Sequence, residues 1–386
     1  MQNVNVLVLW LWDRERSELL AGGMERWCRD LCDLIVSHGY RVTIYQKATR
    51  SFEHKLTDSI TVYGIKASLN FLGNWTLSRY VESHCDANEP FIFVSQELAL
   101  SRKLKRSVGI NHGIFWNGDL PWYKRAANKR LQRYLIERLR GVVCVDTNYI
   151  NWCHAELRGR AKWRSKLHYI PNYADVSMFV KSNNAGNSPT SDDKFTILFA
   201  RRMDGRSIET HGRGLGFLLD AVRLLEMRGI GIRVICAGRG SLKKDIPSWL
   251  ARKGMHSEVI ATEVELDKVF ELYSRCDVVV VPSLEHEGTS LAAIEGLLSG
   301  RPVIVSHIGG LANIVIDGLN GQVCDLRPES LAECLLKVYQ RGAPGDIGIV
   351  KQSRLALGKK RWEEDVWKVL EERLDLCSER LVGMPE

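Results

Sequence analysis

The chain has 386 residues, of which 45% are hydrophobic and 26% are charged, and its formal net charge is +8. This length and composition are typical of a globular protein with two domains or one large one. No apolar run approaches the roughly 18 to 20 residues of a membrane span, which excludes a transmembrane protein. The ten cysteines include no C-x-x-C pair and no zinc-like cluster, so we expect a reduced, cytosolic chain.

The first half of the chain alternates short apolar runs with helical patterns. The apolar start "VNVLVLWLW" is interpreted as a buried strand, because no basic residue precedes it and no cleavage site of a leader follows it. A helical pattern covers 24–39, and continuous apolar strands alternating with helices indicate a parallel sheet covered on both faces. The predicted strands are 4–12, 41–46, 59–65, 91–96, 107–113, 142–147 and 167–172.

The second half repeats this alternation after a polar stretch. Residues 180–194 lack periodicity and are rich in Ser and Asn, which predicts a linker. Strands are then predicted at 195–201, 232–238, 277–283 and 302–308, with a helix at 215–229 and a last amphipathic helix at 361–377. We therefore predict an α/β fold of two doubly wound Rossmann-like domains that face each other across a cleft.

Polar residues and glycines follow the predicted strands of the second half. Arg201 and Arg202 follow the first strand, and Gly238 and Gly240 follow the next. Because ligands of open α/β sheets bind beyond the carboxyl ends of the strands, these residues are expected to meet in one crevice. Arginines, glycines and a helix N-terminus are the groups that bind a diphosphate.

Two glutamates frame a predicted helix start in "EGTSLAAIE". Thr289 or Ser290 is the expected N-cap, so the backbone amides there face an anion. Carboxylates accept hydroxyl hydrogen bonds well, and Glu287 and Glu295 suit a sugar and a ribose on either side of a diphosphate. The pattern predicts a nucleotide-sugar site, whose expected amides are those of Gly288, Thr289, Ser290 and Leu291.

Taken together, these motifs resemble the retaining glycosyltransferases of family 4, which have the glycosyltransferase-B fold. The spacing E-x(7)-E, the turn "AGRGSL", "YIPNYADVSMF", the glycine loop "AGGMER" and the closing "RWEEDVW" carry the resemblance over nearly the whole chain. Ser241 stands where the family has proline, and Tyr173 where it has glycine. The resemblance implies an N-terminal acceptor domain over 1–180, a nucleotide-sugar domain over 181–360 and a helix over 361–386 that crosses back.

The resemblance also implies a role for single residues. Arg202 and Arg213 are the expected diphosphate clamp, with Arg213 where the family has lysine. Glu287 contacts the donor sugar and Glu295 the ribose, while His112 lies near the transferred sugar. Glu287, His112, Arg202 and Arg213 are thus the expected catalytic set. The other expected donor contacts are Gly22 and Gly23, Gly238 and Gly240, and Val264 within the base-reading stretch 262–266.

The expected cofactors and partners follow from the same resemblance. The chain has no D-x-D motif, and a nucleotide-sugar is a substrate, so neither metal nor cofactor is expected. The acceptor is expected to be a glycan or a polyprenyl-diphosphate-linked sugar, in the biosynthesis of bacterial cell-surface polysaccharide such as O-antigen, lipopolysaccharide or exopolysaccharide. The transfer is expected to be hexosyl transfer with retention, from a UDP- or GDP-linked donor.

Residues 101–170 are strongly basic, with 16 Lys/Arg and 4 Asp/Glu, whereas residues 181–386 have a net charge of −1. Trp116, Trp122 and Tyr123 lie beside this charge, and a stripe from Tyr123 to Leu135 is expected to face the core. Interfacial aromatics beside basic residues suit an anionic membrane, so we expect a cytoplasmic protein that is peripheral at the inner face. No nucleic-acid motif accompanies the charge, and no nucleic acid is expected.

Other classes stay open on the sequence alone. A nucleotide-sugar epimerase or a phosphorylase has the same fold, and a non-catalytic sugar-nucleotide binder has the same site. A nicotinamide-dependent oxidoreductase requires G-x-G-x-x-G after the first strand, and "LWLWDRERSELLAGG" lacks it.

Overall fold

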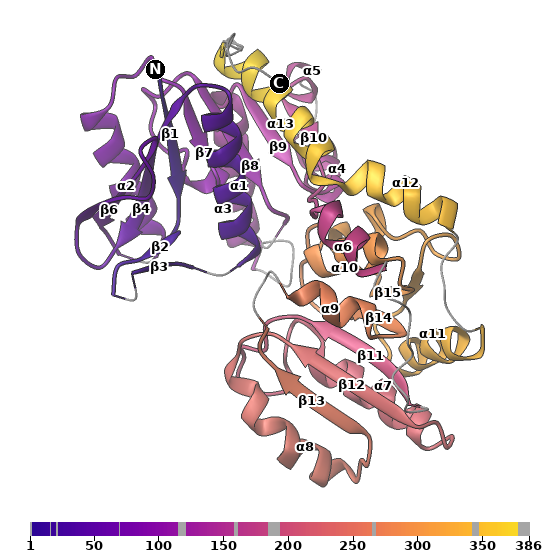
Figure 1. The fold of residues 1–386 in the computed structure, drawn as a ribbon. Coiled ribbons are helices and arrows are strands. Elements are labelled where there is room, and N and C mark those ends of the chain that lie inside the picture. Colours follow the sequence, from indigo (N-terminus) through magenta and orange to yellow (C-terminus); the bar gives the residue numbers. More distant parts are fainter. Residues whose placement is uncertain are drawn as a thin grey trace. The chain divides into compact units, whose positions relative to one another are not determined.

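The computed structural model divides the chain into two compact units (Figure 1). The first unit comprises Met1–Ile170 and Glu363–Glu386, and the second comprises Pro171–Trp362. Each unit has its own sheet and its own core, and each is described by itself. The structure describes residues 2–15, 17–20, 22–68, 70–114, 121–157, 161–183, 194–264, 268–341 and 347–376.

The first unit contains an eight-stranded sheet in the order β10-β9-β8-β7-β1-β4-β6-β5. All neighbouring strands are parallel except β5 and β6, which are antiparallel. The strands are β1 Asn3–Val8, β4 Arg41–Ala48, β5 Phe52–Lys55, β6 Ile60–Lys66, β7 Phe91–Phe93, β8 Ser107–Asn111, β9 Gly141–Cys144 and β10 Leu167–Tyr169, and β2 Trp12–Asp13 pairs with β3 Glu18–Leu19 in a separate hairpin.

Helices connect these strands and cover the first sheet. They are α1 Gly23–Ser37, α2 Phe71–His84, η1 Gln96–Leu98, α3 Trp122–Arg138, α4 Thr147–Glu156 and α5 Ala161–Arg164. Four consecutive residues of β9 are fully buried, as are all three of β7. Buried parallel strands read as continuous apolar runs because both faces of the sheet are covered, which is why the sequence predicted them.

The second unit contains a six-stranded parallel sheet in the order β13-β12-β11-β14-β15-β16. This is the 3-2-1-4-5-6 order of a doubly wound fold, in which the strand order reverses beside the first strand of the unit. The strands are β11 Phe195–Ala200, β12 Ile232–Ala237, β13 Glu258–Thr262, β14 Val278–Val281, β15 Val303–Ser306 and β16 Gln322–Cys324. The reversal lies between β11 and β14, where a ligand site is expected.

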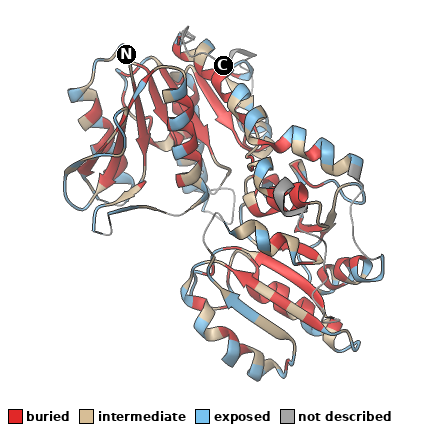
Figure 2. Ribbon diagram, viewed as in Figure 1, coloured by how far each residue is buried: buried red, intermediate tan, exposed pale blue. Residues whose placement is uncertain are grey.

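The helices of the second unit pack two apolar cores against this sheet. They are α6 Val176–Asn183, α7 Leu215–Glu226, η2 Ser241–Asp245, α8 Ile246–Lys253, α9 Val269–Ser274, α10 Leu291–Ser299, η3 Gly309–Asn313, α11 Pro328–Arg341 and α12 Ile347–Leu357. Figure 2 shows β11 and β14 as buried strands. The two sheets, each dominated by parallel strands, are the two Rossmann-like domains that the sequence predicted.

The division of the chain differs from the expected boundaries at two places. The second unit begins at Pro171 instead of residue 181, because α6 packs against α9 and α10 of that unit. Residues 180–183 of the predicted linker belong to α6, and residues 184–193 lie outside the described part of the chain.

The last helix, α13 Lys359–Leu374, is divided between the units after Trp362. In the second unit the ring of Trp362 stacks on Tyr173 with centroids 4.1 Å apart, which gives a packing role to the tyrosine that replaces the expected glycine. In the first unit Trp367 stacks on His38 at 3.6 Å, and Arg140 pairs with Asp375 at 2.5 Å.

Candidate functional site

A buried carboxylate lies at the carboxyl end of β14, where the strand order reverses. The Oε2 atom of Glu287 accepts hydrogen bonds from Arg201, from Arg213 Nη1 at 2.6 Å and from Ser283 Oγ at 2.8 Å. Arg201 directly follows β11, and Ser283 follows β14. The carboxyl ends of two neighbouring parallel strands therefore bring these side chains together, as the rule for open α/β sheets predicts.

The charges in this cluster hold Glu287 ionised. Burial acts to raise the pKa of the Glu287 carboxyl, but the charges of Arg201 and Arg213 and the bonds from Arg201 and Ser283 keep it below its ordinary value. Burial lowers the pKa of Arg201, and the charge of Glu287 opposes that shift. The side chain of Arg201 is 6% exposed and that of Arg213 is 40% exposed, so only Arg213 reaches solvent to a large extent.

All three bonds end on the same oxygen of Glu287. Among the described residues no hydrogen bond to its Oε1 atom is present. The carboxylate has a second acceptor oxygen, so Oε1 keeps its capacity for a hydroxyl donor. The cluster therefore combines a fixed carboxylate with one oxygen that a ligand can use.

Two glycines allow the backbone to close around this cluster. Gly238 has φ +156°, and a Cβ atom there would lie 2.2 Å from the carbonyl oxygen of Arg201. Gly309 has φ +59°, and a Cβ atom there would lie 2.0 Å from the carbonyl oxygen of Glu287. Side chains at either position would therefore clash with the backbone of the residues that carry the charged pair.

The helix that follows Glu287 begins as predicted, but its first turn is arranged differently. Ser290 is the N-cap residue of α10, and its side chain makes no capping bond. Its Oγ instead accepts from Arg201 Nη1 at 3.2 Å, while Thr289 Oγ1 accepts from the backbone N–H of Asn172 at 2.9 Å. Because the Ser290 side chain does not cap the helix, the first turn can receive an anion, next to half-buried Gly288 and Leu291.

Glu295 lies in the second turn of α10 and is only 8% exposed. Its Oε2 atom accepts from the hydroxyl of Tyr273 at 2.7 Å. Burial, together with the charge of Glu295 and its bond, raises the pKa of the Tyr273 hydroxyl, which thus stays a donor. The tyrosine orients the carboxylate that the sequence assigned to the ribose, and no sequence spacing pointed to Tyr273.

The other predicted residues of the second unit follow β11, β12 and β13 of the same sheet. Arg202 is exposed, in contrast to its buried neighbour Arg201. Gly240 precedes η2 and packs against the backbone of Met203, and Val264 is half-buried after β13. The sequence placed the expected arginine one residue later than the one that holds Glu287.

The predicted residues of the first unit lie at the start of α1 and directly after β8. Gly22 is the N-cap residue of α1 and Gly23 its first residue. A Cβ atom on Gly22 would lie 2.0 Å from Oε2 of Glu25, so the carboxylate of Glu25 packs against this glycine. An acidic side chain in the first turn is favoured by the dipole of the helix.

His112 follows β8 and is neutral at physiological pH. Its Nε2 atom lies 2.9 Å from the carbonyl oxygen of Val94, and the ring packs edge-on against Trp27 with centroids 5.6 Å apart. Burial lowers the pKa of the imidazole to about 4, although the bond to Val94 opposes the shift. Since a carbonyl only accepts, Nε2 carries the proton, and Nδ1 of the neutral ring is left as an acceptor.

Neither a metal cluster nor a spanning helix is found in the part of the chain that the structure describes. No group of three or more His, Cys, Asp or Glu side chains there is placed to hold a metal ion. No helix within the described ranges combines the length and the apolar character that crossing a bilayer requires.

Comparisons with known proteins agree with this geometry. Residues 194–341 match the family model of the glycosyl transferases group 1. An uncharacterized glycosyltransferase of Methanocaldococcus jannaschii is 32% identical over 128 residues, which is 33% of this chain and 34% of that protein. The lipopolysaccharide 1,2-N-acetylglucosaminetransferase of Salmonella typhimurium is 24% identical over 147 residues, 34% of this chain and 35% of the relative. The matched part thus spans about a third of each relative's length.

Solved structures extend the likeness over both units. Sucrose-phosphate synthase of Thermosynechococcus elongatus has a TM-score of 0.74 at 14% identity, over 96% of this chain and 99% of that one. The Anabaena protein HepE, solved with UDP and glucose, has a TM-score of 0.68 at 15% identity, over 96% of this chain and 100% of HepE. These findings agree with the resemblance: residues 194–341 are similar to the glycosyl transferases group 1, and the chain has the glycosyltransferase-B fold.

Proposed function

We propose that this chain is a retaining glycosyltransferase that moves a sugar from a UDP- or GDP-linked donor to a glycan or lipid-linked acceptor. The observation that carries the proposal is Glu287, whose Oε2 is held by Arg201, Arg213 and Ser283 beside a helix start whose N-cap residue makes no capping bond. A carboxylate for sugar hydroxyls, and guanidinium groups and helix amides for phosphates, are the groups that a nucleotide-sugar needs.

Arg201 and Arg213 have different roles at the proposed donor site. Arg201 is buried and bonds both Glu287 and Ser290, so it acts to orient the carboxylate and the start of α10. Arg213 is 40% exposed and exchanges its bond to Glu287 for one to a diphosphate oxygen when the donor binds. Arg202, which is exposed at the end of β11, is the second cation available to the diphosphate, as the motif predicts.

The transfer needs no nucleophile from the protein. The bond between the anomeric carbon and the diphosphate oxygen breaks, and the acceptor oxygen bonds to the same face of that carbon. The acceptor proton passes to the leaving diphosphate, whose charge the arginines and amides stabilise. Glu287 positions the sugar through a hydroxyl, and His112, neutral with Nδ1 as an acceptor, offers a second hydroxyl contact.

The pathway is proposed from the relatives. The Salmonella relative is named for lipopolysaccharide, and the Anabaena structure was solved with UDP and glucose. These names support hexosyl transfer in the biosynthesis of a cell-surface polysaccharide. The proposed location, cytoplasmic and peripheral at the membrane, rests instead on the basic charge of residues 101–170.

A panel of nucleotides and nucleotide-sugars tests the proposal. We expect one of UDP, GDP and ADP, with its sugars, to raise the melting temperature, since ligand at a hundredfold excess over Kd adds about 2.7 kcal/mol. Binding and transfer should both survive EDTA. Loss on chelation that magnesium restores would contradict the metal-free site. Consumption of donor without any acceptor would indicate an epimerase, and binding without turnover would indicate a sugar-nucleotide binder.

Replacing Glu295 with alanine is expected to weaken nucleotide binding by about 1 to 3 kcal/mol, the usual cost of losing a charged hydrogen-bond partner. Calorimetric titration with the nucleotide identified above measures the change. Tyr273→Phe is the matched control, because it removes the bond to Glu295 but keeps the carboxylate. An unchanged affinity in folded Glu295→Ala would remove Glu295 from the site.

The membrane contact is proposed for the exposed face of α3 and the cavity beside it, which we call the α3 surface. Trp122 and Tyr123 are 75% and 55% exposed, so the predicted stripe does not face the core at this end. Toward the end of α3 the stripe does turn inward, where Leu135 is buried. Trp116, the third aromatic residue of the prediction, lies outside the described residues. Aromatic side chains next to cations are suited to the interface of an anionic leaflet.

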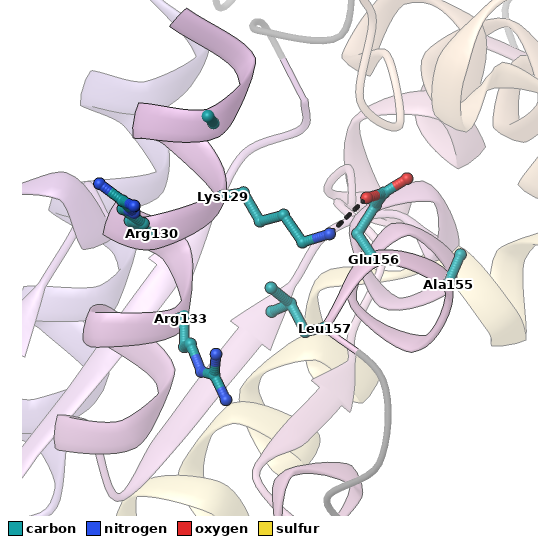
Figure 3. Close-up of a pocket in the computed structure, with 7 residues that line it drawn as sticks. Lys129, Arg130, Arg133, Ala155, Glu156 and Leu157 are labelled. Carbon is teal, nitrogen blue, oxygen red and sulfur yellow. Dashed lines mark hydrogen bonds and ion pairs between the residues drawn. The ribbon is translucent and has the colours of Figure 1, made fainter. Parts of the chain in front are cut away.

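Cations gather around a cavity of about 660 Å³ between α3 and α4 (Figure 3). Lys129, Arg130 and Arg133 line it from α3, and Glu156 lies across from them. Only Lys129 pairs with Glu156 in this cavity, at 3.0 Å, which leaves the lining with a net positive charge. Such a cavity suits the phosphate of a lipid head group.

Neutralising four cations of the α3 surface is expected to release the protein from anionic vesicles. Each basic residue near such a surface contributes about 1 kcal/mol, so the four changes should lower the partition coefficient by about three decades. Added salt should also weaken vesicle binding, because it screens the charges. Sedimentation with phosphatidylserine vesicles measures the loss. The four residues are Lys124, Arg125, Lys129 and Arg130, and a control variant replaces Arg228, Arg252, Arg275 and Arg327, which are exposed in the second unit.

Equal vesicle binding in both variants, or none in the wild type, would contradict a membrane role. Activity on a short soluble acceptor should persist in the variant of the α3 surface, because none of the residues assigned to the donor belongs to that surface. A raised KM for an acidic acceptor alone would assign the α3 surface to that acceptor instead.

A further inference from the structure

A second cavity lies in the first unit, at the carboxyl ends of β1 and β4. Its volume is about 410 Å³, and none of the residues assigned to the donor lines it. The neighbouring strands β1 and β4 are parallel, so both carboxyl ends open at this edge of the sheet, where ligands of α/β folds bind. The side chains that matter for the argument are Trp10, Trp12, Asp13, Glu15, Lys47 and Arg50.

Two tryptophans give this cavity its aromatic lining. Trp10 is 36% exposed although it closely follows a buried strand, and the Lys47 ammonium lies 5.7 Å from its ring centroid. The ring of Trp12 stacks on His54 with centroids 4.0 Å apart. A partly exposed indole leaves apolar surface in contact with water. A ligand that packs on the ring removes this surface from water, which favours binding.

The backbone around these rings is fixed by one buried side chain. Gln46 Oε1 accepts from the backbone N–H groups of Leu11 at 3.0 Å and Trp12 at 2.8 Å, and its Nε2 donates to the carbonyl of Trp12 at 2.9 Å. Gln46 itself is 2% exposed on β4. The cavity wall is therefore formed before any ligand arrives, which lowers the entropy lost on binding.

The polar lining carries both signs of charge. Lys47 is 4% exposed, and its ammonium donates to Asn74 Oδ1 at 2.8 Å. Asp13 ends β2, and Glu15 lies in the turn between β2 and β3. The backbone N–H of Glu15 donates to Asp13 Oδ1 at 2.9 Å. Arg14 and Arg50 also line the cavity, so hydrogen-bond donors and acceptors for hydroxyl groups lie together in it.

We propose that this cavity binds one sugar residue of the acceptor, an inference that rests on the proposed glycosyl transfer. The C–H face of a pyranose packs against the electron-rich face of an aromatic ring, while its hydroxyls pair with carboxylates and ammonium groups. The volume lies in the lower part of the range of about 300 to 1,000 Å³ that small-molecule pockets occupy, which fits one sugar ring better than a long chain.

Binding of simple sugars to the full chain tests this inference, and the measurement does not depend on glycosyl transfer. The probes are methyl α- and β-glycosides of glucose, galactose, mannose and N-acetylglucosamine, followed by saturation-transfer NMR. We expect at least one to bind saturably at millimolar concentration, with its Kd raised tenfold or more by Trp10→Ala. Trp122→Ala removes a more exposed indole elsewhere in the first unit and should leave Kd unchanged.

A second variant guards against misfolding of the first. Glu15 is exposed, so Glu15→Gln should fold normally and raise the Kd of the same glycoside about fivefold or more. No saturable binding by any of the glycosides, or equal Kd in wild type, Trp10→Ala and Glu15→Gln, would overturn the inference. Nucleotide binding on the same samples separates the two proposals: glycoside binding without nucleotide binding refutes the transfer but keeps the sugar cavity.

Discussion

Arg201→Ala is expected to destabilise the protein by about 3 to 5 kcal/mol and to remove most of its transfer activity. The substitution leaves the carboxylate of Glu287 in the interior with only Arg213 and Ser283 as partners, and breaking a buried ion pair from one side has this cost. Urea unfolding followed by circular dichroism gives the change in the free energy of unfolding.

Arg202→Ala is the matched control, because the neighbouring side chain is exposed and has the same charge. Its stability should change by no more than about 0.5 kcal/mol. If the motif assigns Arg202 correctly to the diphosphate, this variant will bind nucleotide more weakly while keeping its stability. Equal stability of the two variants would show that Arg201 does not hold the buried carboxylate. In the double variant Arg201→Met/Glu287→Gln, stability should return without activity, since no buried charge is left unpaired.

Glu287→Gln is expected to lower turnover by about 10²- to 10³-fold, the scale found for a preorganised polar group in an active site. The amide cannot accept from Arg201, Arg213 and Ser283 and also serve a sugar hydroxyl with the same strength. The affinity for free nucleoside diphosphate should stay nearly intact, because the proposed partner of Glu287 is the sugar.

Glu285→Gln makes the same chemical change two residues away, on an exposed side chain, and should turn over like the wild type. Single-turnover rates with saturating donor, together with calorimetry on UDP or GDP, separate chemistry from binding. Full activity in Glu287→Gln would withdraw the assignment of this carboxylate to the transferred sugar.

Much of the fold follows from local pattern. The strands of both sheets are apolar because they are buried on both faces, and the strand-end rule alone predicts that Arg201, Gly238 and Glu287 lie at one edge of the sheet. Strands with weak apolar character escape prediction. β13, with the exposed Ile260 and Ala261, and the three-residue β16 carry no alternation or run that sequence reasoning can detect.

The details of the site depend on contacts that sequence spacing does not encode. Of two adjacent arginines, only the one whose side chain turns inward after β11 reaches Glu287, and consecutive side chains of an extended segment point to opposite sides. Thr289 and Ser290 are equal candidates for the helix cap in the sequence, but the Thr289 hydroxyl is bonded by Asn172, which is distant along the chain. Tyr273 bonds Glu295 from α9, and long-range pairs of this kind arise only from packing.

The saturation of one oxygen of Glu287 has a stereochemical consequence. Arg201 and Ser283 stay bonded to Oε2 when Arg213 turns to the diphosphate, so Oε1 is the oxygen that meets the donor sugar, and Arg201 fixes its direction. An epimer or deoxy sugar with no hydroxyl at that position leaves the desolvated Oε1 without a hydrogen-bond donor, at a cost of about 1 to 3 kcal/mol. If Glu287 has the proposed role, we expect one inverted carbon in the donor to cost about 5- to 150-fold in kcat/KM, so that epimers are distinguished by a single hydroxyl rather than by the size of the pocket.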